Sequence, residues 1–217
     1  VLGSRGLGDV YKRQYEFPRI EIKEEEIMKK ILLTAVNAKY IHSNLAVYSL
    51  RAYARELKEN IVLAEYTINN RTEYILREIY LKKPDVICFS CYIWNISIIL
   101  EVAEEFHKLC PKVPIWVGGP EVSYEVEAFL KEHPFITGVI IGEGEKTFSE
   151  LCRYYVKGEG SLEEMKGIAL FDGAGNVQIH ESQEILDMNT IPFCRRRSAT
   201  VWTMCIFLAF GKIRIPT

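Results

Sequence analysis

Hydrophobic residues follow two alternating patterns along residues 28–182. Short runs of consecutive apolar residues recur, and such runs are typical of strands that are buried on both faces. The runs lie at 31–36, 61–66, 86–90, 114–117 and 138–141. Between them, apolar residues return at helical spacing, which predicts amphipathic helices. These helices are expected at 45–57, 72–81, 96–109, 124–132 and 146–155.

The repeated order of strand and then helix predicts an α/β fold. Right-handed crossovers between parallel strands give a doubly wound, five-stranded parallel sheet that is covered on both faces. After the fifth helix, 167–171 and 177–180 flank a Gly-rich turn at 172–176. This pattern predicts a C-terminal β-hairpin that extends or caps the sheet. Ser43 and Asn44 are the candidate N-caps of the first helix.

Residues 1–27 precede this pattern and have neither a strand nor a helix period. They also lack the apolar core of about 7–15 residues that a secretory signal peptide needs. Residues 1–14 resemble translated adapter or vector sequence, and Met28 begins a run that looks like a native start. We therefore expect 1–27 to be a non-native or disordered leader, with an ordinary flexible arm as the alternative.

The chain changes character again after Phe193. Residues 194–210 are basic and then apolar, without an acidic residue. The apolar part, 201–210, is shorter than the roughly 20 residues that cross a bilayer. A buried strand and a truncated helix are the alternatives to an aberrant reading frame. The expected organisation is a domain at 28–182, followed by a linker and an aberrant tail at 183–217.

Composition and charge narrow the range of partners. The chain has 27 Lys and Arg against 29 Asp and Glu, which gives a formal net charge of −2. A protein without excess positive charge is a poor candidate for binding the phosphate backbone of nucleic acids. We expect neither a nucleic-acid nor a membrane partner. Without a signal peptide, the six Cys residues are expected in a reducing, cytoplasmic compartment.

The loops after the predicted strands are the informative part of the sequence. In an open α/β sheet, ligands bind at the carboxyl ends of the strands, next to the topological switch point. Small or polar residues occupy the loops at 37–44, 90–95, 118–121 and 142–145. The glycine pair Gly118-Gly119 lets another group approach the backbone closely, although a tight turn explains that pair equally well. The four loops together predict a ligand site.

Common phosphate ligands do not fit these loops. A P-loop needs Gly before its Lys, but Glu145 precedes Lys146. A dinucleotide fingerprint belongs after the first strand, where the loop has no Gly, and the acidic residues of 142–145 would repel a pyrophosphate. A phosphoacceptor receiver needs acidic residues where this chain has Asn37 and Ser90.

An ordered set of motifs carries a family resemblance. The motifs are the loop from Asn37 into the first helix, DVICFS at 85–90, VGGPE at 117–121, GEGE at 142–145 and ILDMNTIPF at 185–193. With them, residues 28–193 resemble the N-terminal cobalamin (B12)-binding domain of B12-binding radical SAM proteins. The resemblance implies a flavodoxin-like (Rossmann-like) domain with cobalamin at its strand ends. It also implies a radical SAM domain as partner, which would carry S-adenosylmethionine and the [4Fe–4S] cluster. The chain looks truncated before that domain.

The resemblance also implies a set of cofactor-binding residues. The nucleotide tail would lie beside Ser90, Gly118 and Gly119, where a bulky side chain would collide with it. The backbone of 142–145 would line the opposite wall, and the corrin would lie over the loop after the first strand. The candidate residues are Asn37, Ile41, His42, Asn44, Ser90, Tyr92, Gly118, Gly119, Pro120, Glu121, Gly142, Glu143, Gly144 and Glu145.

Two departures limit what the resemblance implies. The Asp-x-His-x-x-Gly motif of other cobalamin domains is absent, because Tyr40 and Leu45 replace the Asp and Gly around His42. We therefore expect cobalamin without an axial His from this domain, with a His42–cobalt bond as the alternative. The chain also lacks Cys-x3-Cys-x2-Cys, and we interpret Cys88 as a core residue and Cys91 as a loop thiol. No catalytic or metal-ligating residue is expected, so the fragment is not catalytic alone.

Two other functions stay open at this point. One is a flavodoxin-like module that binds another ligand or a protein but no cobalamin. A Gly119→Trp variant should separate the two, since we expect it to abolish cobalamin uptake and leave the secondary structure intact. The other is a free-standing enzyme of glycosyltransferase or dehydrogenase type, which the missing nucleotide fingerprint disfavours.

Overall fold

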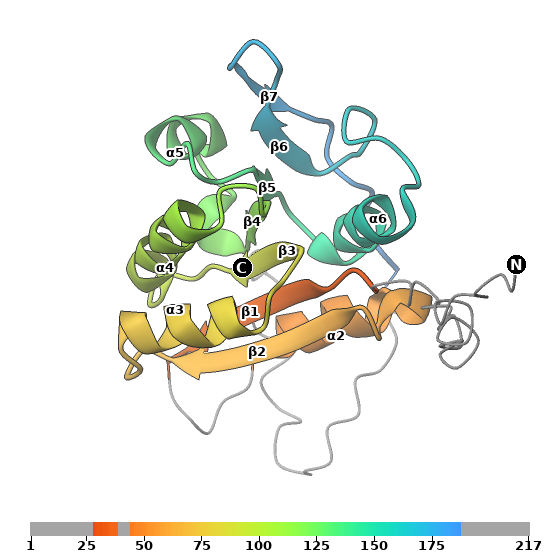
Figure 1. Cartoon of the computed structure of the whole chain (residues 1–217). Coiled ribbons are helices and arrows are strands. Elements are labelled where there is room, and N and C mark those ends of the chain that lie inside the picture. Colours follow the sequence, from red (N-terminus) through yellow and green to blue (C-terminus); the bar gives the residue numbers. More distant parts are fainter. Residues whose placement is uncertain (1–27, 39–43, 188–217) are drawn as a thin grey trace, which may run out of the picture.

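A computed structural model describes residues 28–38 and 44–187 of this protein. Its strands form one sheet of seven in the order β2-β1-β3-β4-β5-β6-β7 (Figure 1). The strands are β1 (Ile31–Asn37), β2 (Ile61–Thr67), β3 (Val86–Ser90), β4 (Ile115–Gly118), β5 (Gly138–Ile140), β6 (Ile168–Phe171) and β7 (Val177–Ile179). The first five pair in parallel, and β6 and β7 add antiparallel pairs at the end. The predicted doubly wound sheet with a hairpin extension is confirmed.

The helices lie close to their predicted positions. They are α2 (Leu45–Tyr53), α3 (Thr72–Leu81), α4 (Ile96–Leu109), α5 (Val126–Glu132) and α6 (Gly144–Lys157), with the 3-10 turns η1 (Arg55–Leu57) and η2 (Pro120–Val122). The bounds of α3 and α4 agree with the sequence analysis. The predicted helix 45–57 is divided, because Arg55 adopts a positive φ of 48° after the last turn of α2.

Two further differences concern the starts of helices. Helix α5 begins at Val126 rather than Tyr124, because Glu125 has a φ of 48° and breaks the helical backbone before it. Helix α6 begins at Gly144, two residues before the predicted start, so part of the GEGE loop is the first turn of a helix. That change matters for the site, since a helix start places backbone N–H groups there.

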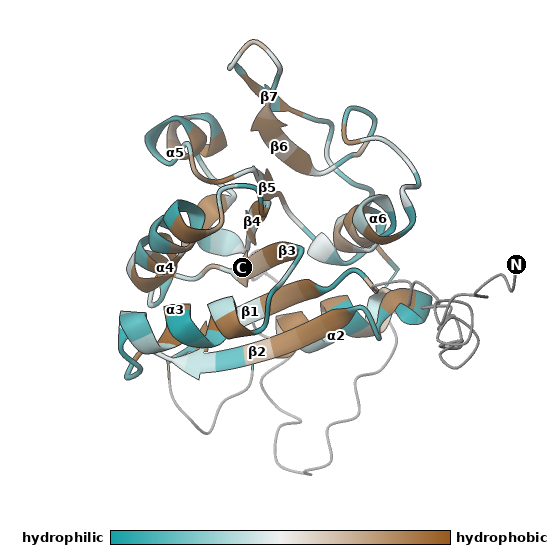
Figure 2. Cartoon of the chain, viewed as in Figure 1, coloured by the Kyte–Doolittle hydropathy of each residue, from teal (hydrophilic) through white to brown (hydrophobic). Residues whose placement is uncertain are grey.

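Helices cover both faces of the sheet, which explains the uninterrupted apolar runs of the strands. In Figure 1, α3, α4 and α5 lie on one face, and α2 and α6 lie on the other. Side chains of β1 alternate between two cores: Leu32 and Val36 pack with the first group of helices, Leu33 and Ala35 with the second. Figure 2 shows the strands as the most hydrophobic part of the molecule, between helices with hydrophilic outer faces.

The hairpin returns the chain to the edge of the sheet that carries the carboxyl ends of the parallel strands. Gly138, the first residue of β5, lies opposite Leu170 near the end of β6, so the turn 172–176 lies at the amino edge. Strand β7 runs back, and the N–H of Gly167 donates to the carbonyl of Glu181 at 2.7 Å. The described chain therefore leaves the sheet beside the predicted ligand loops.

Several predictions concern residues outside the described part of the chain. The leader at 1–27 and the tail beyond Asp187 are among them, and so are Ile41 and His42. The domain bounds and the axial ligand therefore stay predictions. Among residues 28–38 and 44–187, no helix combines the length and the apolar character needed to cross a lipid bilayer.

Candidate functional site

The predicted loops meet where the strand order changes direction. From β1 the chain crosses to β2 on one side, and from β2 it returns past β1 to β3 on the other. The carboxyl ends of β1 and β3 are therefore neighbours whose connections depart in opposite directions, the arrangement that opens a crevice in α/β sheets. Asn37 and Asn44 flank this point from β1, and Ser90 and Tyr92 flank it from β3.

A hydrogen bond links the two strand ends. The side-chain amide of Asn44 donates through Nδ2 to Ser90 Oγ at 3.2 Å. The other amide atom of Asn44, Oδ1, accepts from the backbone N–H of Ala46 at 3.1 Å, which confirms Asn44 as the N-cap of α2. Burial raises the pKa of the Tyr92 phenol, and hydrogen bonds with Ser90 and Asn44 act in the opposite direction. Three predicted residues therefore form one polar cluster.

Asn95 supports this cluster from below, a role that the sequence analysis missed. Its side chain is fully buried and donates to the carbonyls of Val36 at 2.9 Å and Ser90 at 3.0 Å. It also accepts from the backbone N–H of Tyr92 at 2.8 Å. One amide thus joins the ends of β1 and β3 and fixes the start of the β3–α4 loop. An Asn directly before an apolar helix was the available signal, but it indicates only a cap.

Gly119, directly after β4, is required by the protein's own backbone. Gly119 has a φ of 119°, and a Cβ added there would lie 2.4 Å from the carbonyl oxygen of Cys91. Cys91 N–H in turn donates to the Gly118 carbonyl at 2.7 Å. A side chain at position 119 would therefore displace the β3 loop. Gly119→Trp would thus disturb the protein's own structure as well as any ligand space, so it does not separate the two functions as expected.

The loop after β5 has a different character. Gly142 has a φ of 76°, and a Cβ added there would meet no heavy atom within 4 Å. Glu143 Oε2 accepts from the backbone N–H of Leu186 at 3.1 Å, and Glu145 Oε1 accepts from Ser49 Oγ at 3.0 Å. The two carboxylates thus contact other parts of the protein: the chain after β7 and helix α2. Pro120 and Glu121, in the 3-10 turn after β4, are exposed.

Neither cysteine of the C-x2-C pair faces a shared site. Cys88 packs in the core between the sheet and α2 and α6, whereas Cys91 packs in the opposite core. Burial raises the pKa of both thiols, that of Cys91 to about 12. Cys91 lies in the loop after β3, as predicted, but its side chain is fully buried. The described residues hold no group of three or more His, Cys, Asp and Glu side chains arranged to bind a metal ion.

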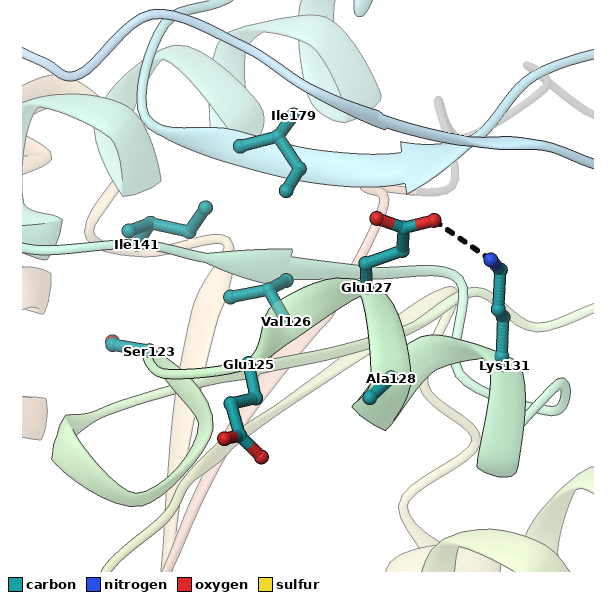
Figure 3. Close-up of a pocket in the computed structure, with 8 residues that line it drawn as sticks. All are labelled: Ser123, Glu125, Val126, Glu127, Ala128, Lys131, Ile141 and Ile179. Atoms are coloured by element: carbon teal, nitrogen blue, oxygen red, sulfur yellow. Dashed lines mark hydrogen bonds and ion pairs between the residues drawn. The ribbon is translucent and has the colours of Figure 1, made fainter.

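A shallow hollow of about 600 Å³ lies elsewhere, between the start of α5 and β7 (Figure 3). Val126, Ile141 and Ile179 line it with apolar side chains, and the ion pair between Glu127 and Lys131 at 2.7 Å borders it. Its lining includes none of the predicted cofactor residues. The polar cluster and the hollow are therefore separate features.

Comparison with known proteins agrees with the resemblance drawn from the motifs. The family model described as "B12 binding domain" matches residues 31–152, which are 122 of the 217 residues. The cobalamin-dependent radical SAM methyltransferase TokK of Streptomyces tokunonensis is 38% identical over 69 residues, or 32% of this chain and 10% of that protein. The hopanoid C-3 methylase of Methylococcus capsulatus is 26% identical over 123 residues, or 56% of this chain and 24% of that protein.

A solved structure has the same fold. The cobalamin-dependent S-adenosylmethionine radical enzyme OxsB with aqua-cobalamin bound aligns with a TM-score of 0.62 and 22% identity. The alignment covers 77% of this chain and 24% of OxsB. The chain thus spans a quarter or less of the length of these proteins. Because the family model matches more than half of the chain, this protein belongs to the B12-binding domain family.

Proposed function

We propose that this domain binds cobalamin at the crevice between the carboxyl ends of β1 and β3, as the cofactor module of a radical SAM protein. The observation that carries the proposal is the polar cluster of Asn44, Ser90 and Tyr92, which bridges the switch point of a B12-binding fold. Two of the proteins named above, TokK and OxsB, are cobalamin-dependent radical SAM enzymes, and they support the wider context.

The residues at this edge have chemistry that suits cobalamin. Its corrin carries neutral amide side chains, and neutral amide and hydroxyl groups exchange hydrogen bonds with such groups without the cost of burying a charge. Asn44, Ser90 and Tyr92 supply groups of this kind. Gly142 leaves open space on the far side of the edge. Bound cobalamin would supply the cobalt that carries a methyl group or tunes radical chemistry in the complete protein.

Further proposals concern the partner domain, the ligation of cobalt and the surroundings of the protein. A radical SAM domain with S-adenosylmethionine and a [4Fe–4S] cluster would be the partner of this module. The cobalt would bind without an axial His from this domain. The described cysteines, Cys88, Cys91, Cys110 and Cys152, form no disulfide, which suits the reducing cytoplasm that we propose as its compartment. The net charge of −2 supports the absence of a nucleic-acid partner.

Uptake of hydroxocobalamin by the whole chain tests the proposal. Equilibrium dialysis at tens of micromolar should leave one cobalamin per chain, with a changed visible spectrum. Absence of uptake would refute cobalamin binding and leave the alternative of a module with another ligand.

A pair of glycine variants tests the location. Gly142→Trp adds bulk at the proposed site, and Gly175→Trp adds the same bulk in the β6–β7 turn at the opposite edge. Both positions have positive φ, 76° and 84°, and open space around the added Cβ, so the backbone strain is matched. We expect Gly142→Trp to lower the affinity at least tenfold and Gly175→Trp to retain it. Equal affinities for the two variants would place cobalamin elsewhere.

A further inference from the structure

Glu65 is an acidic residue within the otherwise apolar strand β2. Its side chain is half-buried and accepts three hydrogen bonds. Oε1 accepts from Asn37 Nδ2 at 3.0 Å and from the backbone N–H of Asn44 at 3.1 Å. Oε2 accepts from the hydroxyl of Tyr48 on α2. The carboxylate is therefore surrounded by neutral donors from the segments before and after the β1–α2 connection.

Two of these donors lie at the two ends of the β1–α2 connection. Asn37 is the last residue of β1, and Asn44 is the N-cap of α2. The connection between β1 and α2 thus starts and finishes at one side chain, which belongs to the neighbouring strand. Among the ion pairs of the described residues, none involves Glu65. Three donors from β1, the start of α2 and its first turns converge on this one carboxyl group and hold it in place.

Asn44 connects Glu65 with the crevice, because it forms hydrogen bonds with both Glu65 and Ser90. The backbone of Asn44 donates to Glu65, while its side chain caps α2 and donates to Ser90 Oγ. Moving the backbone of Asn44 would therefore move the amide that bridges β1 and β3. The carboxylate is also turned inward to its own chain. It does not present itself to a ribose, as the acidic residue of a dinucleotide site does.

We propose that Glu65 is a positioning residue for the cofactor crevice: it fixes the two ends of the β1–α2 connection and so presents the Asn44 amide to Ser90 and to the ligand. This inference rests on the proposed cobalamin function. It predicts that Glu65 affects cobalamin binding through Asn44 and not by contact with the cofactor. A strand residue that served only the fold would have no such dependence on Asn44.

A double-mutant cycle in the full chain tests this dependence. Hydroxocobalamin affinity is measured for Glu65→Ala, Asn44→Ala and the double variant, with Glu73→Ala on the exposed side of α3 as control. We expect each single variant to weaken binding about tenfold and the double variant to be no weaker than Asn44→Ala, because the two residues act in series. Glu65→Gln keeps an acceptor oxygen for Asn37 and Asn44 and should restore most of the affinity. Multiplied losses in the double variant, or a Glu65→Ala variant with wild-type affinity, would overturn the proposal.

Hydrogen exchange separates failure of this inference from failure of the proposed function. In Glu65→Ala without ligand, the Asn44 N–H should exchange at least tenfold faster, while the amides of α4 keep wild-type rates. If the wild-type chain takes up no cobalamin but this local increase is found, the cofactor assignment fails and the positioning role of Glu65 stands. Unchanged exchange at Asn44 overturns the role of Glu65 in either case.

Discussion

The two halves of the carboxyl edge are built in different ways. Around β1 and β3, side chains determine the shape: Asn44, Ser90 and Glu65 are joined by hydrogen bonds, and a buried Asn95 lies beneath them. Around β4 and β5, backbone conformation determines the shape, through the positive φ angles of Gly119 and Gly142. The first half can exchange polar contacts with a ligand. The second half offers close approach to the main chain.

Gly119 and Gly142 look equivalent in the sequence, but their surroundings in the structure differ. Gly119 and Gly142 both have positive φ, but an added Cβ would lie 2.4 Å from Cys91 O in one case and in open space in the other. Gly119 is therefore needed by the fold, whereas Gly142 is free to serve a ligand.

Gly119→Ala should cost the most stability. The new methyl group would contact the Cys91 carbonyl, and the backbone would be held in a conformation that L-residues rarely adopt. Strain and overpacking together should lower the free energy of unfolding by about 3 kcal/mol, measured by urea denaturation. A loss below about 1 kcal/mol would mean that the β4 loop is not constrained by Cys91.

Asn95→Ala tests the side-chain half of the edge. The variant leaves the carbonyls of Val36 and Ser90 and the N–H of Tyr92 without this partner. We expect a loss of about 2 kcal/mol in the free energy of unfolding, because buried groups lose their hydrogen bonds. Asn95→Asp should be at least as destabilising at neutral pH, since a carboxylate would face two carbonyl oxygens. If neither substitution changes the stability, Asn95 does not hold the ends of β1 and β3 together.

Gly142→Ala should have a smaller effect than Gly119→Ala. Here only the positive φ of 76° is unfavourable, because no atom lies within 4 Å of the added Cβ. The expected loss is about 1 kcal/mol by the same denaturation measurement. If Gly142→Ala and Gly119→Ala cost the same, the proposed distinction between the two glycines is incorrect.

Glu143→Ala should have the smallest effect on stability, within about 0.5 kcal/mol, because the contact lies at the surface. The hydrogen bond from Leu186 N–H would be lost, so that amide should exchange several times faster with deuterium. Glu145→Ala serves as the control, since its partner is Ser49 on α2. Equal exchange at Leu186 in both variants would show that Glu143 does not hold the chain after β7.

The fold could be predicted from the sequence because its signal is local. Runs such as Val86–Ser90 and the helical spacing of Ile96–Leu109 gave the bounds found in the structure. The candidate loops followed from the general rule for strand ends. The roles of Glu65 and Asn95 could not be predicted, because Asn95 contacts Val36, 59 positions away, and Glu65 contacts Asn37, 28 positions away. A lone acidic residue in an apolar strand was the only signal for Glu65.

Hydrogen exchange of the whole chain with and without hydroxocobalamin shows where the cofactor binds. If cobalamin occupies the crevice between β1 and β3, exchange should slow at 44–48, 90–95 and 118–121, and the β6–β7 turn should be unaffected. Protection confined to 123–131 and 177–179, around the hollow between α5 and β7, would refute binding between β1 and β3. So would uptake of cobalamin without protection of either region.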